Sequence, residues 1–212
     1  MPSPLKCLLL LVLVLAGQAA ATVQQVDLLH VDGEVLQTTT TPLAPHLAKV
    51  GWTLPEDAII ASSNARGYLA EWAVEDGRLV LRDATITAFR IETGVGPQSI
   101  KGELFPGQAR VVADWYTGAL IVPDGELVED ALLGSAPRFD HYQVFRVASG
   151  EVLGRLSLTG EQFDAYRMDR FKAYLQTPEF LESCERLRED GWDDQEILRF
   201  LWDAALEYYL GL

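Results

Sequence analysis

The sequence predicts an α+β fold: an antiparallel β-sheet or small barrel built from hairpins, followed by about three C-terminal helices. In the middle of the chain, short runs of alternating apolar and polar residues are separated by Asp-Gly or Ser-Gly pairs, which is typical of hairpins. The last quarter instead carries aromatic and aliphatic residues at helical spacing. We therefore expect a signal peptide (1–21), a mostly β domain (22–158) and a helical segment (159–212) packed on it.

The first residues are typical of a secretory signal peptide. Lys6 precedes an apolar run from Cys7 to Ala16, and Ala19-Ala20-Ala21 supplies the small residues that a signal peptidase recognises. The run is shorter than the ~20 apolar residues that cross a bilayer, which favours cleavage over a membrane anchor. We expect a protein exported to the periplasm or the medium, with no integral membrane segment after cleavage.

The mature N-terminus is expected at Thr22 or a residue next to it, because only there does a small-residue site follow the apolar run. N-terminal sequencing of the protein recovered from the cell envelope measures this directly. Recovery of an intact Met1 would contradict the export prediction.

The charge balance excludes one class of partner. The chain has 31 Asp plus Glu against 17 Lys plus Arg, a formal net charge of −14, and loss of Lys6 with the signal makes it one unit more negative. A protein binds nucleic acid by neutralising phosphates with Lys and Arg, so we expect no nucleic-acid partner. The partners that remain are an envelope protein or an extracellular ligand.

Cys184 is the one cysteine that follows the signal peptide, so no intramolecular disulfide can form in the mature chain. The residue could be a nucleophile or a dimer link. It lies in an expected amphipathic helix, however, where a small buried side chain is commoner.

The β domain is expected to begin with a short hairpin or strand and an irregular segment, because Gly33, Pro42 and Pro45 interrupt residues 22–55. A clear hairpin follows, turning at Glu75-Asp76-Gly77-Arg78 into a strand from Leu79 to Leu81. Period-two alternation places four residues of its first strand on one face: Tyr68, Ala70, Trp72 and Val74.

Two further hairpins are predicted. One pairs Ala109–Tyr116 with Ala119–Val122 through Thr117-Gly118, and the other turns at Ser149-Gly150. The intervening ETGVGPQSIKGELFPGQ is predicted to be a loop, since its prolines interrupt any helix and it lacks the Gly-Lys-Ser/Thr of a phosphate-binding loop. We expect one antiparallel sheet from about Tyr68 to Leu158.

The helical segment carries clear boundary signals. Thr159 to Gln162 fits a capping box, Thr177-Pro178 starts the next helix, and Gly191 ends it. The last helix begins at Asp193 or Asp194. Its predicted apolar stripe leaves Asp203 and Glu207 toward water and consists of Ile197, Leu198, Leu201, Ala205 and Tyr208. The helices are expected to dock on the sheet through Phe163, Phe171, Leu201 and Tyr208.

Searches for catalytic patterns find no complete one in the sequence. His30, His46 and His141 show no metal-ligand spacing, so we expect no metal site and no cofactor. The sequence also lacks a Gly-x-Ser-x-Gly elbow.

The stretch ADWYTGALIVPDGEL holds the main site candidates. Alternation predicts that Trp115 faces one way while Asp114 and Tyr116 face the other. Asp114 could contact a ligand, or it could cap the turn, which is the commoner role of Asp. Six residues are candidate binding residues: Tyr68, Trp72, Asp114, Trp115, Tyr116 and Glu126.

Four segments carry a resemblance to a known family. RGYLAEW, DGRLVLRD, GELFPG and ADWYTGALIVPDGELVE occur in this order, from about Arg66 to Glu129. As an ordered set they resemble an uncharacterised family of bacterial proteins with Arg-Gly-Tyr-x-Ala-x-Trp, Leu-Phe-Pro-Gly and Ala-Asp-Trp-Phe/Tyr-x-Gly, then Pro-x-Gly-Glu-Leu. The resemblance implies a grouping and no established activity.

Two functions fit these observations. The first is a non-catalytic exported module of the cell envelope that binds through the aromatic-rich sheet or the helical end. The alternative is a hydrolase that uses an acid near Trp115, such as Asp114 or Glu126.

Overall fold

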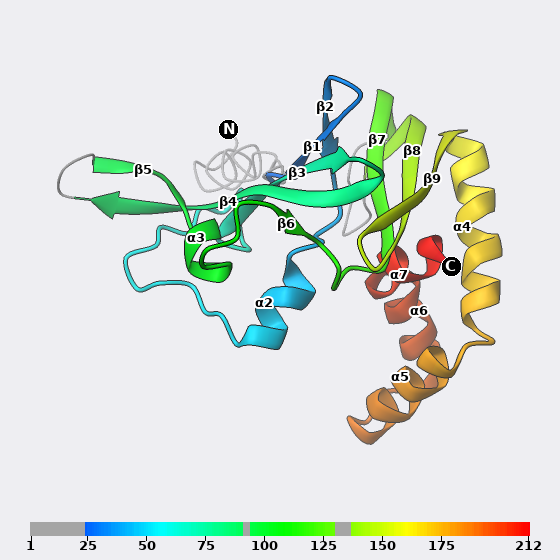
Figure 1. The fold of residues 1–212 in the computed structure, drawn as a ribbon. Helices are drawn as coiled ribbons and strands as arrows, with labels where there is room; N and C mark the ends of the chain where they lie inside the picture. The colour runs from blue at the N-terminus through cyan, green and yellow to red at the C-terminus, as the bar shows by residue number, and fades with distance from the viewer. Residues whose placement is uncertain (1–23, 91–93, 130–136) are drawn as a thin grey trace, which may run out of the picture.

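The structure, a computed structural model, describes residues 24–90, 94–129 and 137–212 (Figure 1). The predicted signal peptide, residues 1–21, lies outside these residues. Across the described ranges, no helix has both the length and the apolar character needed to traverse a bilayer. The predicted α+β class is confirmed, with one large sheet and several helices gathered at the C-terminal end.

The described strands form one 9-stranded sheet. They are β1 (Asp27–Val31), β2 (Glu34–Thr38), β3 (Tyr68–Glu75), β4 (Arg78–Arg90), β5 (Gly94–Ser99), β6 (Val111–Val112), β7 (Gly118–Glu129), β8 (Arg138–Ala148) and β9 (Glu151–Thr159). The order is β2-β1-β3-β4-β9-β8-β7, and β5 and β6 both pair with β4. The predicted antiparallel arrangement holds for the described pairs apart from β1 with β3, which run parallel.

Two predicted hairpin turns are confirmed, and the N-terminal segment forms a third hairpin. Asp76-Gly77 joins β3 to β4, and both residues have positive φ, 52° and 71°. Ser149-Gly150 joins β8 to β9 in the same way. Asp32-Gly33 connects β1 to β2. Positive φ at both central residues gives the backbone twist that matches paired strands, which is why Gly follows Asp or Ser in each turn.

The hairpin predicted around Thr117-Gly118 is wrong. Val111 and Val112 pair with β4, whereas β7 pairs along its length with β8. A local alternation pattern cannot distinguish a neighbouring partner strand from a distant one, and here the distant pairing wins. The loop predicted around Pro97 is also wrong in part, because Gly94–Ser99 is the edge strand β5. Proline is tolerated there because a free edge needs no N–H.

The sheet curls until its two end strands meet. The Thr39 amide N–H donates to Ile121 O of β7 at 2.9 Å, and the Thr38 hydroxyl donates to the same carbonyl at 3.1 Å. Elsewhere in the sheet, the pairing between β4 and β9 is short. It includes a hydrogen bond from the Leu79 N–H to Gly150 O at 2.8 Å. Side chains from many strands therefore enclose one core, which includes Leu29, Trp72, Leu81, Leu120 and Phe145.

The described helices are α2 (Ala44–Val50), α3 (Lys101–Leu104), α4 (Gly160–Tyr174), α5 (Pro178–Glu189), α6 (Asp194–Ala204) and α7 (Leu206–Gly211). The predicted capping box at Thr159 is confirmed, and Thr177 and Asp193 cap α5 and α6. The last predicted helix is in fact two, because the chain breaks at Ala205, where φ is −97° and ψ is 10°.

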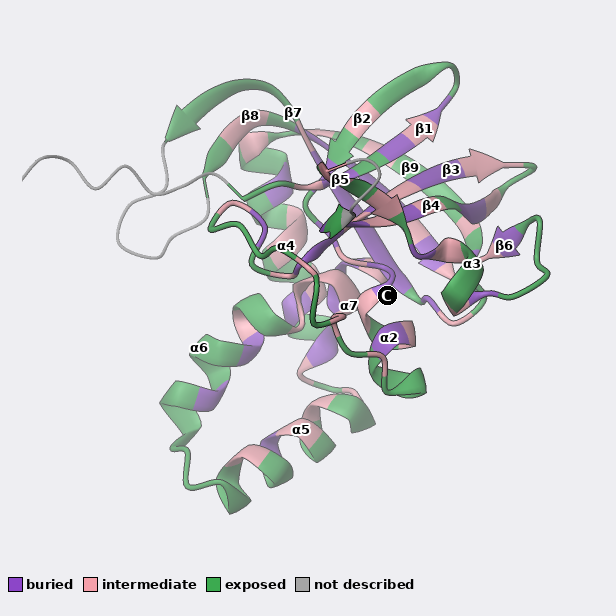
Figure 2. Cartoon of the chain, turned by 90° about the vertical axis from the view of Figure 1, so that its left-hand side faces the viewer, coloured by how far each residue is buried: buried purple, intermediate pink, exposed green. Residues whose placement is uncertain are grey.

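A second core forms where helices cover β7 and β8. Phe163, Phe171 and Leu201 are buried there, as predicted, and so is the free Cys184. The fully buried tyrosine is Tyr209, whereas the predicted Tyr208 is only half-buried. α5 and α6 contribute Cys184 and Leu201 to this core and otherwise extend away from the sheet (Figure 2). We call residues 178–204 the helical arm.

Candidate functional site

The aromatic candidates of the sheet lie inside the protein. Trp72 is fully buried, and Tyr68 and Tyr116 are nearly so. Burial also raises the pKa of Tyr68 to about 12, so its hydroxyl stays protonated at neutral pH. These three rings therefore stabilise the core and offer no surface to a partner.

Trp72 and Arg66 instead hold a buried acid that the sequence did not single out. Asp27 accepts from Arg66 Nη2 at 3.0 Å, from Trp72 Nε1 at 3.1 Å and from the Ala70 amide at 3.2 Å. Burial raises the pKa of the Asp27 carboxyl, and the Arg66 charge and these donors oppose the rise. The carboxylate is satisfied by the protein itself, which indicates a structural role.

The faces predicted for the stretch after β6 are wrong. The strand ends at Val112, and a turn closed by Tyr116 N–H to Ala113 O at 2.9 Å breaks the alternation. Asp114 is consequently exposed while Tyr116 is buried. Trp115 is half-buried.

Trp115 belongs to a small aromatic stack at one end of the sheet. Its ring centroid lies 5.3 Å from that of Phe105 and 4.6 Å from that of His46, and its Nε1 donates to Pro42 O at 2.9 Å. Burial lowers the pKa of His46, with Lys49 contributing, while the Asp114 charge raises it. The stack joins α2 and α3 to the sheet, and its ring surface is largely used in these contacts.

Asp114→Ala is expected to change the free energy of unfolding by less than about 0.5 kcal/mol, as for ordinary surface positions. A turn cap, the commoner role of Asp, would cost about 1 kcal/mol to remove, but no described residue donates a hydrogen bond to the Asp114 carboxylate. Urea denaturation midpoints of the wild type and the variant test this. A loss of 1 kcal/mol or more would show that the Asp114 side chain caps the turn.

Glu126 lies within β7, well beyond its first residue, whereas Asp114 precedes the strand. Its side chain is exposed, and its amide N–H donates to Asp140 Oδ1 at 2.8 Å. At ~3.3 Å per strand residue, Glu126 stands roughly 25 Å beyond Gly118, where the strand begins. Paired carboxylates in glycoside hydrolysis are at most about 10 Å apart, so this placement does not support Asp114 and Glu126 as such a pair.

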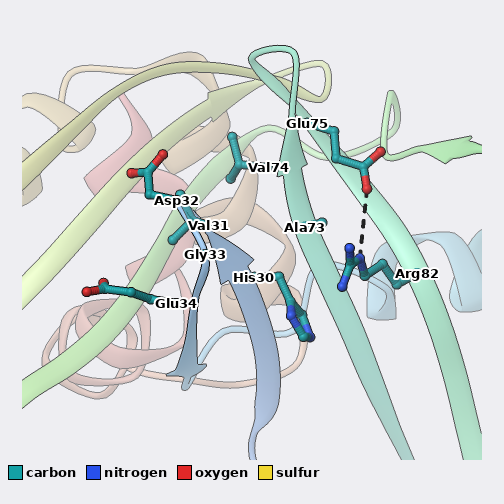
Figure 3. Close-up of a pocket in the computed structure, with 9 residues that line it drawn as sticks. All are labelled: His30, Val31, Asp32, Gly33, Glu34, Ala73, Val74, Glu75 and Arg82. Atoms are coloured by element: carbon teal, nitrogen blue, oxygen red, sulfur yellow. Dashed lines mark ion pairs between the residues drawn. The ribbon is translucent and has the colours of Figure 1, made fainter.

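An open groove of about 260 Å³ lies between the β1–β2 turn and the ends of β3 and β4 (Figure 3). Its lining residues are His30, Val31, Asp32, Gly33, Glu34, Ala73, Val74, Glu75 and Arg82. His30 Nε2 lies 2.6 Å from Glu71 Oε1, and Glu75 pairs with Arg82 at 3.8 Å.

His30 lines the groove and pairs with Glu71, which lies outside the lining. An imidazole beside a carboxylate can move a proton, but the lining contains no Ser, Thr or Cys that could act as a nucleophile. Within the described residues, no group of three or more His, Cys, Asp or Glu is placed to hold a metal ion. The sequence missed His30 with Glu71 because the two residues come from strands far apart in the chain.

Glu207 of α7 is half-buried and hydrogen-bonded to the protein, whereas the sequence placed it toward water. Its Oε1 accepts from the Thr41 amide at 3.0 Å, and its Oε2 lies 3.3 Å from the Tyr116 hydroxyl. Burial raises the pKa of Glu207 to about 7. Extending one helical stripe through residue 205 caused the error, because the break at Ala205 turns α7 toward the sheet.

The helical arm carries the exposed large apolar residues of the C-terminal segment beyond α4. They are Leu181, Trp192, Leu198 and Phe200. Trp192 and Phe200 contact each other, with ring centroids 5.2 Å apart, and both remain accessible. The arm also holds nine Asp and Glu against three Arg, so the apolar side chains lie among acids.

Comparisons of the chain with protein-family models, curated proteins and solved structures give no match. The choice between sites therefore depends on geometry alone.

Proposed function

We propose that the protein is an exported, non-catalytic binding module of the cell envelope that contacts a protein partner through the helical arm. The observation that carries this is the division of its apolar side chains. The aromatic candidates Tyr68, Trp72 and Tyr116 are buried. In contrast, Leu181, Trp192, Leu198 and Phe200 remain exposed on a part of the chain that extends from the body (Figure 2). Exposed apolar residues gathered on one part of the chain are typical of an interaction surface.

The charge of the arm defines the partner further. Its acids leave a net negative surface around the exposed apolar residues. Complementary charge steers association and disfavours wrong partners, so the surface that fits the arm is apolar with Lys or Arg at its rim. A hydrolase built on Asp114 or Glu126 has less support. Both acids are exposed, and they lie on different segments, Asp114 before β7 and Glu126 within it.

Two matched variants test the proposal. Phe200 on the arm is 44% exposed and Phe89 on β4 is 56% exposed, so neither substitution disturbs a core. Tagged mature protein carrying Phe200→Glu or Phe89→Glu is used to capture proteins from a solubilised envelope fraction. We expect Phe200→Glu to reduce the captured partner at least about tenfold, as for an interface hot spot, and Phe89→Glu to leave it unchanged. Equal recovery by both variants would refute the arm as the binding surface.

A further inference from the structure

The short helix α7 is seated against the start of β7 by a contact that only glycine permits. A Cβ built on Gly211 would lie 2.5 to 2.7 Å from backbone atoms of Gly118, and one on Gly118 would lie 3.0 Å from Glu207 O. Next to this contact, Tyr209 and Leu210 are fully buried. The position of α7 is therefore closely defined, and Glu207 is carried with it against the curled sheet.

The Glu207 carboxyl is held by polar groups rather than by a cation. Besides the Thr41 amide, the Thr41 hydroxyl approaches its Oε1 at 3.4 Å. No ion pair to Glu207 is found within residues 24–90, 94–129 and 137–212. On the other side of α7, Arg167 pairs with Asp203 and Arg170 donates to Leu212 O, so these α4 cations are engaged elsewhere.

The hydrogen-bond geometry favours a protonated carboxyl. The Tyr116 hydroxyl has one proton and lies 2.8 Å from Ala119 O but 3.3 Å from Glu207 Oε2. When that proton is donated to the carbonyl, the contact with Glu207 is satisfied only if the carboxyl donates a proton of its own. If the carboxyl is ionised, Glu207 Oε2 and Ala119 O are two acceptors that share the single Tyr116 hydroxyl proton.

A second acid near Glu207 also opposes its ionisation. Asp27 of β1 lies near enough for its charge to act on Glu207, with the same sign. The Glu207 charge in turn raises the pKa of two buried phenols, Tyr68 of β3 and Tyr116, and both stay neutral. Burial is the main cause of the raised pKa of Glu207 and the Asp27 charge adds to it, while the hydrogen bonds from Thr41 and Tyr116 lower it.

We propose that Glu207, Thr41 and Tyr116 form a pH-sensitive latch that holds α7, and with it the base of the helical arm, against the curled sheet. With its carboxyl protonated, the latch is closed. Ionisation places a charge in a half-buried site where no described residue supplies a cation, and it loosens α7. This motion is passed to α6, which joins α7 at Ala205. The latch does not depend on the proposed function; only its effect on partner binding does.

The sign of the pH dependence follows from the two states. Glu207 has a pKa of about 7 when α7 is docked and the ordinary 4.5 when it is released. The docked state therefore holds more protons between these values, and docking weakens as pH rises through that window. Opening should increase by about tenfold per pH unit within the window and level off above pH 7.

Hydrogen exchange and NMR test the latch on the intact mature chain. The Thr41 amide nitrogen reports on the carboxyl it contacts, and its chemical shift should titrate with a midpoint of about 7 in the wild type. Protection of α7 amides, corrected for intrinsic exchange, should fall about tenfold per unit between pH 5 and 6.5. Glu207→Gln keeps an oxygen acceptor but cannot ionise, so its α7 protection should not vary over this range.

Two results would overturn the latch. One is a titration midpoint near pH 4.5 for the Thr41 amide nitrogen shift, measured in the wild type alone. The other is the same pH dependence of α7 protection in Glu207→Gln as in the wild type. Neither measurement involves a partner, so failure of the latch and failure of the arm as a binding surface are distinguishable.

Discussion

Replacing Trp72 by alanine is expected to lower the free energy of unfolding by about 4 kcal/mol, which is a large part of the total stability of most domains. The ring is fully buried in the core enclosed by the sheet, so its removal leaves a cavity among side chains from several strands. The change also deprives the buried Asp27 carboxylate of the Nε1 donor at 3.1 Å. An unsatisfied buried acceptor adds to the cost of the cavity.

Trp115→Ala is the matched control for this prediction. Trp115 is half-buried, whereas a ring that filled the core would cost about 3 kcal/mol or more to remove. The structure indicates a smaller loss, since part of the ring meets solvent and the rest stacks on Phe105 and His46. Urea denaturation of both variants gives the order. A greater loss of unfolding free energy for Trp115→Ala than for Trp72→Ala would contradict the placement of Trp72, and not Trp115, at the centre of the core.

Truncation after Thr159 is expected to make the protein aggregate. It removes the helices that cover the outer face of β7 and β8, where Ala119, Ile121, Tyr142 and Val144 are buried in the second core. A contiguous apolar sheet face exposed to water is an association surface. Sedimentation velocity and binding of a hydrophobic dye, compared with the full mature chain, measure the effect. A truncated protein that is soluble and unfolds cooperatively would show that the helices form a separate unit.

The sequence predicted well those features that local chemistry determines. The Asp76-Gly77 and Ser149-Gly150 turns require positive φ, and Thr159 with Gln162 satisfies the first amides of α4. Each of these signals acts within four residues, so the neighbouring sequence suffices to find it. The buried Phe163, Phe171 and Leu201 follow in the same way from helical spacing.

Features that depend on distant pairing escaped the sequence. The parallel pairing of β1 with β3 and the pairing of β6 with β4 join segments whose local patterns fit several partners. Asp27 meets Arg66 and Trp72, and Glu207 meets Thr41, across long stretches of chain. Acids are abundant in this sequence, so nothing local distinguishes a buried carboxylate from a solvated one.

The same limitation shaped the site prediction. Aromatic residues in the sheet were candidates because alternation shows that they share a face without showing whether that face is covered. The structure places Tyr68, Trp72 and Tyr116 in the core and leaves Asp114 and Glu126 on the surface, apart from each other. The helical end, which was the other binding surface considered, keeps four large apolar residues of the arm exposed: Leu181, Trp192, Leu198 and Phe200.

Site-specific photocrosslinking in living cells tests the central claim, contact between the helical arm and a protein partner, most directly. A photoreactive amino acid replaces Leu198 on the arm in one strain and Val95 on β5 in another, both of which are exposed positions. The account predicts a discrete crosslinked species from position 198, abolished by Phe200→Glu in the same chain, and none from position 95. A crosslink from position 95 alone, or one from position 198 that survives Phe200→Glu unchanged, would contradict it.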